Sequence, residues 1–169
     1  MANTYKLIAS STVGSGGATD ITFSSIPATY TDLVVHLTAR TTATGTMTNI
    51  KLDFNGTTSN RSFRGLYGTG SAAGSETDTT IMTGYVSGDG ATANTFGSTF
   101  IYIPNYASSN YKSVSTDSVG EDNATYALAN PNAALWSDTA AITSIKLYPD
   151  ASKNFKQYST AYLYGIKSS

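Results

Sequence analysis

The chain is short of the side chains on which most enzymes depend. Its 169 residues include one His, no Cys and only 12% charged residues. General acid and base catalysis, nucleophilic catalysis and transition-metal binding draw mainly on His, Cys, Lys and paired carboxylates. The composition therefore argues against an enzyme and predicts no bound cofactor.

Clustered charge and long apolar runs are also missing. The 10 basic residues are scattered along the chain, and the formal net charge is -1. A nucleic-acid partner would require grouped Lys and Arg to face its phosphates, so none is expected. No segment approaches the roughly 18 apolar residues of a membrane-spanning helix, and the N-terminus lacks the basic and apolar regions of a signal peptide. Membrane insertion is not expected either.

The residues that are present predict an all-β protein. Apolar and polar residues alternate with a period of two, which places successive side chains on opposite faces of a strand. Clusters of Gly, Asn, Asp, Ser and Pro separate the alternating segments. These segments are 5–9, 20–23, 33–38, 50–54, 63–67, 80–86, 95–103, 111–119, 142–148 and 158–166. Their number and spacing predict a single-domain antiparallel β-sandwich of jelly-roll type over residues 1–169, with about 8 to 10 strands.

Three shorter segments lie outside this pattern. Residues 132–136 are the only ones that could form a turn of helix. Residues 68–75 and 87–94 consist of small side chains and are expected to be surface connections at one end of the sandwich. Such loops serve either recognition or simple chain reversal, and the second use is the more common one.

Individual residues give little support for catalysis. His36 is expected on the polar face of a strand, as a surface or interface residue, because no Ser or carboxylate has the spacing of a triad. The Gly-rich segment 13–17 resembles a phosphate loop, but no Lys-Ser/Thr follows it and the next segment is strand-like. The phosphate interpretation is therefore rejected.

One local group of carboxylates could hold a cation. Asp117, Glu121 and Asp122 lie close together in sequence, and oxygen-rich loops can bind calcium. The spacing does not fit an EF-hand, and acidic residues at strand ends are usually solvated, so calcium is the weaker interpretation. A glycosidase pair would require two carboxyl groups that face each other across a cleft, which the sequence does not indicate.

Aromatic residues are dense in the second half of the chain. Tyr is favoured where one end of a ring is buried and the other is hydrogen-bonded, as at interfaces. On a strand at 158–166, alternate residues share one face, and this face is predicted to lie at the core margin or in a subunit contact. Its interface candidates are Tyr158, Tyr162, Tyr164 and Ile166. Trp136 is expected in the core next to Leu135 and Ile142, with sugar stacking as the less favoured alternative.

Five segments resemble small virion structural proteins of tailed bacteriophages, including cyanophages. They are ITFSSIPATYTDLVVHLTAR (21–40), IKLDFNG (50–56), FIYIPNYASSNYKS (100–113), LWSDTAAITSIKL (135–147) and FKQYSTAYLYGIK (155–167). The resemblance covers almost the whole chain and includes no catalytic motif. It implies a jelly-roll capsid decoration (cement) protein, located in the virion, that binds the major capsid protein or another virion protein. Threefold symmetry is natural for such proteins, so a homotrimer is expected.

The same resemblance leaves a second function open. A receptor-binding tip of a tail or head fibre would use the loops 68–75 and 87–94 to contact a glycan on the host surface. A glycoside-active enzyme is the weakest alternative, because candidate acid/base pairs are scarce.

Overall fold

The computed structural model describes residues 4–150 and 152–167. Within this part of the chain all regular structure is β, and it forms twelve strands. They are β1 (Tyr5–Thr12), β2 (Ile21–Phe23), β3 (Asp32–Ala39), β4 (Met47–Phe54), β5 (Arg61–Gly68), β6 (Ala73–Asp78), β7 (Ile81–Ser87), β8 (Gly97–Ile103), β9 (Lys112–Glu121), β10 (Ala127–Trp136), β11 (Ile145–Pro149) and β12 (Thr160–Ile166). No helix in these residues is long and apolar enough to cross a membrane.

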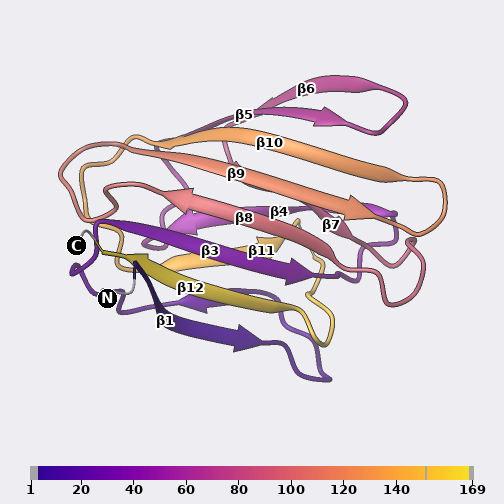
Figure 1. Ribbon diagram of the computed structural model, residues 1–169, viewed down its shortest axis with the longest axis horizontal. Coiled ribbons are helices and arrows are strands. Elements are labelled where there is room, and N and C mark those ends of the chain that lie inside the picture. Colours follow the sequence, from indigo (N-terminus) through magenta and orange to yellow (C-terminus); the bar gives the residue numbers. More distant parts are fainter. Residues whose placement is uncertain (1–3, 151, 168–169) are drawn as a thin grey trace.

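The strands form two antiparallel sheets, which confirms the predicted all-β sandwich. The larger sheet has the order β1-β12-β3-β8-β9-β10-β5-β6, and the smaller has the order β2-β11-β4-β7. The larger sheet extends from β1 to the β5–β6 hairpin, with the smaller sheet behind its central part (Figure 1). If β5–β6 and β9–β10 are set aside, the remaining eight strands alternate between the sheets along the chain, except that the consecutive strands β4 and β7 both lie in the smaller sheet. This order is consistent with the jelly-roll type.

An apolar core fills the space between the sheets where β3 faces β4 and β11. Leu33, Val35 and Leu37 alternate along β3 and are buried, and Ile50 and Leu52 of β4 are fully buried as well. Full burial of a Leu or Ile side chain contributes about 1.5–3 kcal/mol. The period-two pattern read from the sequence is thus the pattern that forms this core.

The layer between β7 and the β9–β10 pair is polar instead. Ser118 and Asn130 are buried there, at 1% and 0% exposure, and the Ser118 hydroxyl accepts a hydrogen bond from the Tyr85 backbone N–H at 3.0 Å. Gly84 of β7 lies against them with φ of +119°. A side chain at this glycine would overlap Ser118, so the close approach of β7 to β9 requires Gly84.

Two strands differ from the sequence prediction. Residues 132–136, expected to allow a helical turn, belong to β10, whose side chains alternate between exposed and buried positions. Residues 73–75, expected in a loop, begin β6, which pairs with β5. Both strands consist mainly of small and polar residues and lack the apolar alternation that marks the others. Pairing with the neighbouring strands holds them in the sheet, so twelve strands form where about ten were expected.

The two expected loops lie at the same end of the larger sheet. Gly68, at the end of β5, pairs with Ala129, which pairs with Val119, which in turn pairs with Ser98 near the start of β8. The connections after Gly68 and before Gly97 therefore leave the sheet at one level. This placement agrees with the sequence prediction.

Candidate functional site

Aromatic and apolar side chains cover the outer face of four adjacent strands of the larger sheet. We call this surface the aromatic strip; its members are Tyr5 and Leu7 on β1, Tyr162 and Tyr164 on β12, His36 on β3 and Phe100 on β8. Strand register places them in rows: Leu7 pairs with Tyr164, while Tyr162 pairs with His36 and His36 with Phe100. Each strand supplies its outward positions, so the strip follows from the same alternation that builds the core.

The rings of the strip contact one another across strands. His36 lies edge-on to Phe100 at 5.1 Å between ring centroids, and edge-on to Tyr164 at 5.8 Å. Tyr164 also lies edge-on to Tyr5, at 6.3 Å, and is stacked with Tyr162 at 6.3 Å. Such pairs prefer these geometries and hold one another in place. The strip is therefore an ordered surface before any partner binds.

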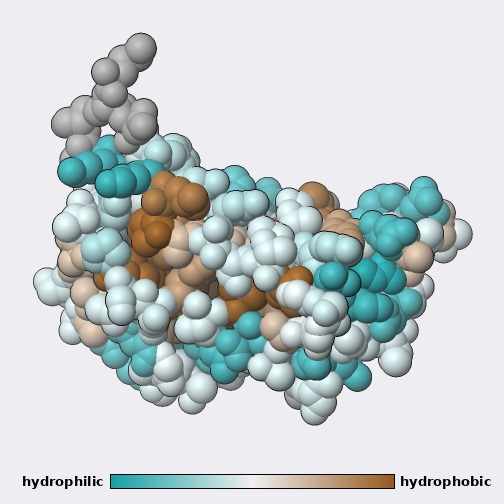
Figure 2. Space-filling view, turned by 90° about the horizontal axis from the view of Figure 1, so that it is seen from below, coloured by the Kyte–Doolittle hydropathy of each residue, from teal (hydrophilic) through white to brown (hydrophobic). Residues whose placement is uncertain are grey.

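The strip is also exposed. Tyr5 and Leu7 are each 50% exposed, Tyr162 is 41% exposed and Phe100 is 37% exposed. Single apolar residues on a surface need no explanation, but a contiguous patch of them marks an interaction site. Seen from the β1 side, apolar patches lie within a largely polar surface (Figure 2).

The structure separates one of the four interface candidates, Tyr158, from the other three. Tyr162 and Tyr164 are members of the strip, and Ile166 lies beside it, paired with Tyr5 at the end of β12. Tyr158 precedes β12, is 69% exposed and lines a different hollow at the loop end of the molecule. The sequence alone could identify the Tyr face of β12. It could not show that β1, β3 and β8 add Tyr5, His36 and Phe100 to that face.

The other half of the same outer face carries mostly smaller side chains, together with the charged residues Arg64, Asp117 and Glu121. It comprises β9, β10, β5 and β6, and we call it the small-residue half; its apolar members are Leu66, Val119, Ala129, Pro131 and Ala133. Two hollows lie on it, of about 580 and 480 Å³. Val119 and Ala129 line the first, while Leu66, Pro131 and Ala133 line the second. One face thus carries projecting rings on one side and apolar hollows on the other.

The candidate calcium ligands do not converge. Asp117 is on the exposed face of β9, where it pairs with Phe100 and Pro131. Glu121 lies four residues further along the same strand. Glu121 accepts a hydrogen bond from the Asn123 backbone, and the buried Asp122 carboxylate accepts two, from Ala124 and Tyr126. Among the described residues, no group of three or more His, Cys, Asp and Glu could hold a metal ion. Glu121 and Asp122 bind backbone groups of the loop between β9 and β10.

His36 and Trp136 occupy positions of the kind that the sequence suggested. His36 is exposed, but it is part of the aromatic strip instead of an isolated polar residue. Trp136 is 1% exposed and belongs to the core, together with Ile142. Its ring contacts Phe54 at 5.5 Å, while Leu135 lies on the opposite face of β10. Sugar stacking on Trp136 is excluded by this burial.

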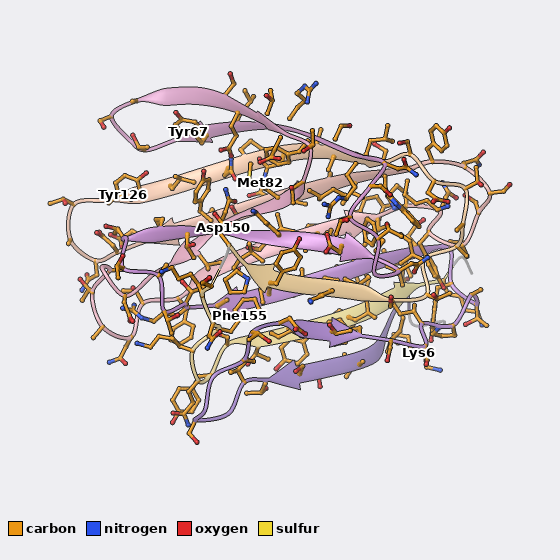
Figure 3. The ribbon with its side chains drawn as sticks, turned by 180° about the vertical axis from the view of Figure 1, so that it is seen from behind. Lys6, Tyr67, Met82, Tyr126, Asp150 and Phe155 are labelled. Carbon is orange, nitrogen blue, oxygen red and sulfur yellow. The ribbon has the colours of Figure 1, made fainter. Side chains whose placement is uncertain are left out.

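A second group of tyrosines lies on the inner side of the β5–β6 extension. Tyr67, Tyr85 and Tyr126 line a hollow of about 330 Å³ with Glu76, and Tyr67 and Tyr126 lie near each other at this end of the molecule (Figure 3). The Tyr85 hydroxyl donates a hydrogen bond to the Glu76 carboxylate at 2.9 Å. Burial, reinforced by this carboxylate, raises the pKa of Tyr85 far above its ordinary value. Tyr85 thus stays protonated inside the fold.

Alkaline pH is expected to destabilise the protein through its buried phenols. Burial also raises the pKa of Tyr106 and of Tyr148, and a hydrogen bond to Asp32 raises that of Tyr102. These pKa values are higher in the folded chain than in the unfolded chain. The protonated phenols therefore stabilise the fold fully below about pH 10, and this stabilisation is lost as the pH rises through the pKa values of the folded chain. We expect Tm to fall steeply between roughly pH 10 and 12.

The variant Tyr85→Phe tests this explanation. Phe cannot ionise, so the stability difference between wild type and Tyr85→Phe should shrink as the pH rises above about 10. Tyr111→Phe, at a ring that is 60% exposed, is the control and should follow the wild-type curve. A difference that stays constant from neutral to alkaline pH would show that Tyr85 does not contribute.

Comparison with known proteins identifies no family. No family model matches the chain, and no curated protein matches its sequence.

Proposed function

We propose that the chain is a non-enzymatic virion structural protein of a bacteriophage, specifically a capsid decoration (cement) protein that assembles as a trimer on the head and stabilises the shell. The observation that carries this proposal is the aromatic strip, an exposed and ordered apolar surface across four strands. The resemblance of five sequence segments to tailed-phage virion proteins supplies the biological setting.

The chemistry of the outer face suits contact between copies of the chain. Interface cores are rich in aromatic residues and poor in charge, and the strip has this composition. The small-residue half offers apolar hollows on the same face. In a closed ring, the strip of one copy can meet the small-residue half of the next, and each copy then makes the same two contacts. Head-to-tail contacts of this kind close into a ring, and with threefold symmetry the ring contains three copies.

Replacing Tyr162 and Tyr164 together with Ala tests the proposed interface. Both residues face outward from β12, so their removal should leave the core intact while it weakens subunit association. Light scattering after size-exclusion chromatography should report a trimer for wild type and smaller species for the double variant. Truncation of an aromatic hot spot at the centre of an interface costs about 2 kcal/mol or more, so association should weaken at least roughly thirtyfold.

The control for this experiment is Tyr111→Ala, which removes an exposed ring outside the strip. It should associate as wild type does. A wild-type chain that is monomeric at all concentrations, or a double variant that remains trimeric, would contradict the proposed interface.

Copy number in purified particles tests the decoration role itself. A decoration protein that covers the shell is present in hundreds of copies, whereas a receptor-binding fibre tip is present in a dozen or so. Quantitative mass spectrometry of particles distinguishes the two functions. A low copy number would overturn the decoration proposal and favour the fibre tip.

A further inference from the structure

We infer that a hollow at the loop end of the molecule, which we call the Tyr158 hollow, is a binding site for a neutral pyranose sugar. The hollow measures about 500 Å³ and lies between the β7–β8 loop and the segment before β12. The residues that line it include Tyr158, Asp89 and Lys156, together with Arg40, Asn94 and Gln157. This inference goes beyond the proposed decoration role and does not depend on it, because the hollow is separate from the aromatic strip.

The first observation is that Tyr158 is both exposed and strained. Its side chain is 69% exposed, and its backbone has φ of +73°, in the region that favours Gly and Asn. A bulky residue there costs about 1–3 kcal/mol, and an exposed ring recovers little of that cost through packing. Folding alone would favour Gly or Asn at this position. The presence of an aromatic ring at this position is thus explained best by a binding role of its exposed surface.

The backbone around Tyr158 is firmly held, so the ring has a defined base. Phe155 is fully buried in the core (Figure 3), and its N–H donates to Ala18 at 2.7 Å. The Lys156 N–H donates to Arg40 at 2.8 Å, and the Tyr158 N–H donates to Val13 at 3.0 Å. These three bonds tie the segment to other parts of the fold. The backbone that carries the Tyr158 ring therefore needs no ordering when a sugar binds.

The opposite wall of the hollow is ordered by a buried Arg. Arg40 is 6% exposed, and its guanidinium group donates to the carbonyl oxygens of Ala91 at 2.9 Å, Thr92 at 2.8 Å and Thr95 at 3.0 Å. One side chain thus fixes much of the loop that the sequence identified as 87–94. Its donors are used by the loop, so Arg40 shapes the hollow and leaves recognition to the other groups.

Asp89 and Lys156 supply the polar part of the site. The Lys156 ammonium group donates to the Asp89 carboxylate at 2.5 Å, and the Arg40 guanidinium group lies 3.9 Å from the same carboxylate oxygen. The pair therefore presents an acceptor and a donor side by side, both about two-fifths exposed. Vicinal hydroxyl groups of a pyranose match such a pair, because each hydroxyl can both donate and accept.

These features together specify the ligand class. An aromatic ring binds the apolar C–H face of a sugar, and the adjacent acceptor and donor bind its hydroxyl edge. The exposed Lys156 is paired with Asp89, and Arg40 is buried with its donors on carbonyl groups of the loop, so neither cation is left unpaired for the carboxylate of an acidic sugar. A neutral hexopyranose is the ligand that fits this arrangement.

Saturation-transfer-difference NMR with the full chain tests the inference. The probes are the methyl pyranosides of glucose, galactose, mannose and N-acetylglucosamine, each at millimolar concentration. We expect transfer to the C–H protons of at least one probe in wild type. Tyr158→Ala should weaken that binding about tenfold, as expected for loss of a stacked ring. Asp89→Asn should weaken it as well, because a charged acceptor is replaced by a neutral one.

Tyr111→Ala serves as the matched control, since Tyr111 is another exposed ring, at 60% exposure, outside the hollow. It should bind as wild type does, and the Tm of each variant shows that it is folded. Absence of transfer to all four probes, or equal transfer in wild type and Tyr158→Ala, would overturn the site. Neither result bears on trimer formation or particle copy number, so the decoration proposal stands or falls separately.

Discussion

Replacing Gly84 with Ala is expected to lower the free energy of unfolding by about 3 kcal/mol or more, because two costs combine at this position. The backbone has φ of +119°, which an L side chain rarely adopts. The added methyl group would also overlap the Ser118 hydroxyl and approach the Asn130 side chain. Relief requires β7 to move away from β9, which separates the two sheets. Thermal unfolding should show a Tm lowered by roughly 10 °C.

A matched glycine separates the two costs. Gly70, in the β5–β6 hairpin, also has positive φ, at +83°, but no atom lies within 4 Å of where its Cβ would be. Gly70→Ala therefore introduces the backbone cost without the overlap, and should lower stability by about 1 kcal/mol. If Gly70→Ala is as damaging as Gly84→Ala, close packing against Ser118 is not the cause.

The double variant Gly84→Ala/Ser118→Gly gives a further check on the same contact. Removal of the Ser118 side chain opens the space that the new methyl group needs, although it also removes the hydrogen bond from the Tyr85 N–H. The double variant should be more stable than the sum of the single effects predicts, since the two residues interact directly. Strict additivity would contradict the proposed overlap.

Strands with regular apolar alternation could be predicted from the sequence, and strands held by their neighbours could not. Along β3 the sequence alone separates inward from outward residues, because Leu33, Val35 and Leu37 occupy every second position, and along β12 it separates a Tyr face from a face of mostly small residues. Along β10 the inward positions include Asn130 and Asn132, whose burial is possible only through hydrogen bonds to other residues. Such partners come from distant parts of the chain, so a local pattern does not reveal them.

The candidate surfaces also divide into features that the local sequence reveals and features that depend on distant parts of the chain. The Tyr face of β12 was predictable, but the aromatic strip depends on the order β1-β12-β3-β8, which brings Tyr5, His36 and Phe100 together. The two hollows of the small-residue half arise from side chains too small to attract notice in a sequence. At the loop end, the sequence identified the loop 87–94 and Tyr158 separately, and only the structure places them in one hollow.

The burial of Lys112 could not be anticipated either, since an alternating strand with one Lys usually exposes it. Lys112 is 1% exposed, and its ammonium group donates to the carbonyl oxygens of Ser108 at 2.8 Å, Asp138 at 3.3 Å and Ala140 at 2.6 Å. It also lies over the Trp136 ring, 5.6 Å from the centroid. Burial lowers the pKa of Lys112, and the nearby Asp138 opposes that shift. One side chain thus joins the loops that follow β8 and β10.

Lys112→Ala is therefore expected to lower the free energy of unfolding by about 4 kcal/mol, because three carbonyl groups lose their donor and the Trp136 ring loses its neighbour. Lys112→Met keeps the aliphatic stem and removes only the donor, so it should cost less, about 2 kcal/mol.

The control is Lys146→Ala: Lys146 lies 5.5 Å from the Tyr148 ring centroid in a similar geometry, but its side chain is 46% exposed. Its loss should change stability by less than about 1 kcal/mol. Urea denaturation measures all three variants, and hydrogen exchange should show faster opening at residues 104–111 and 137–144 in Lys112→Ala. Equal effects of Lys112→Ala and Lys146→Ala would show that the buried ammonium group does not hold these loops.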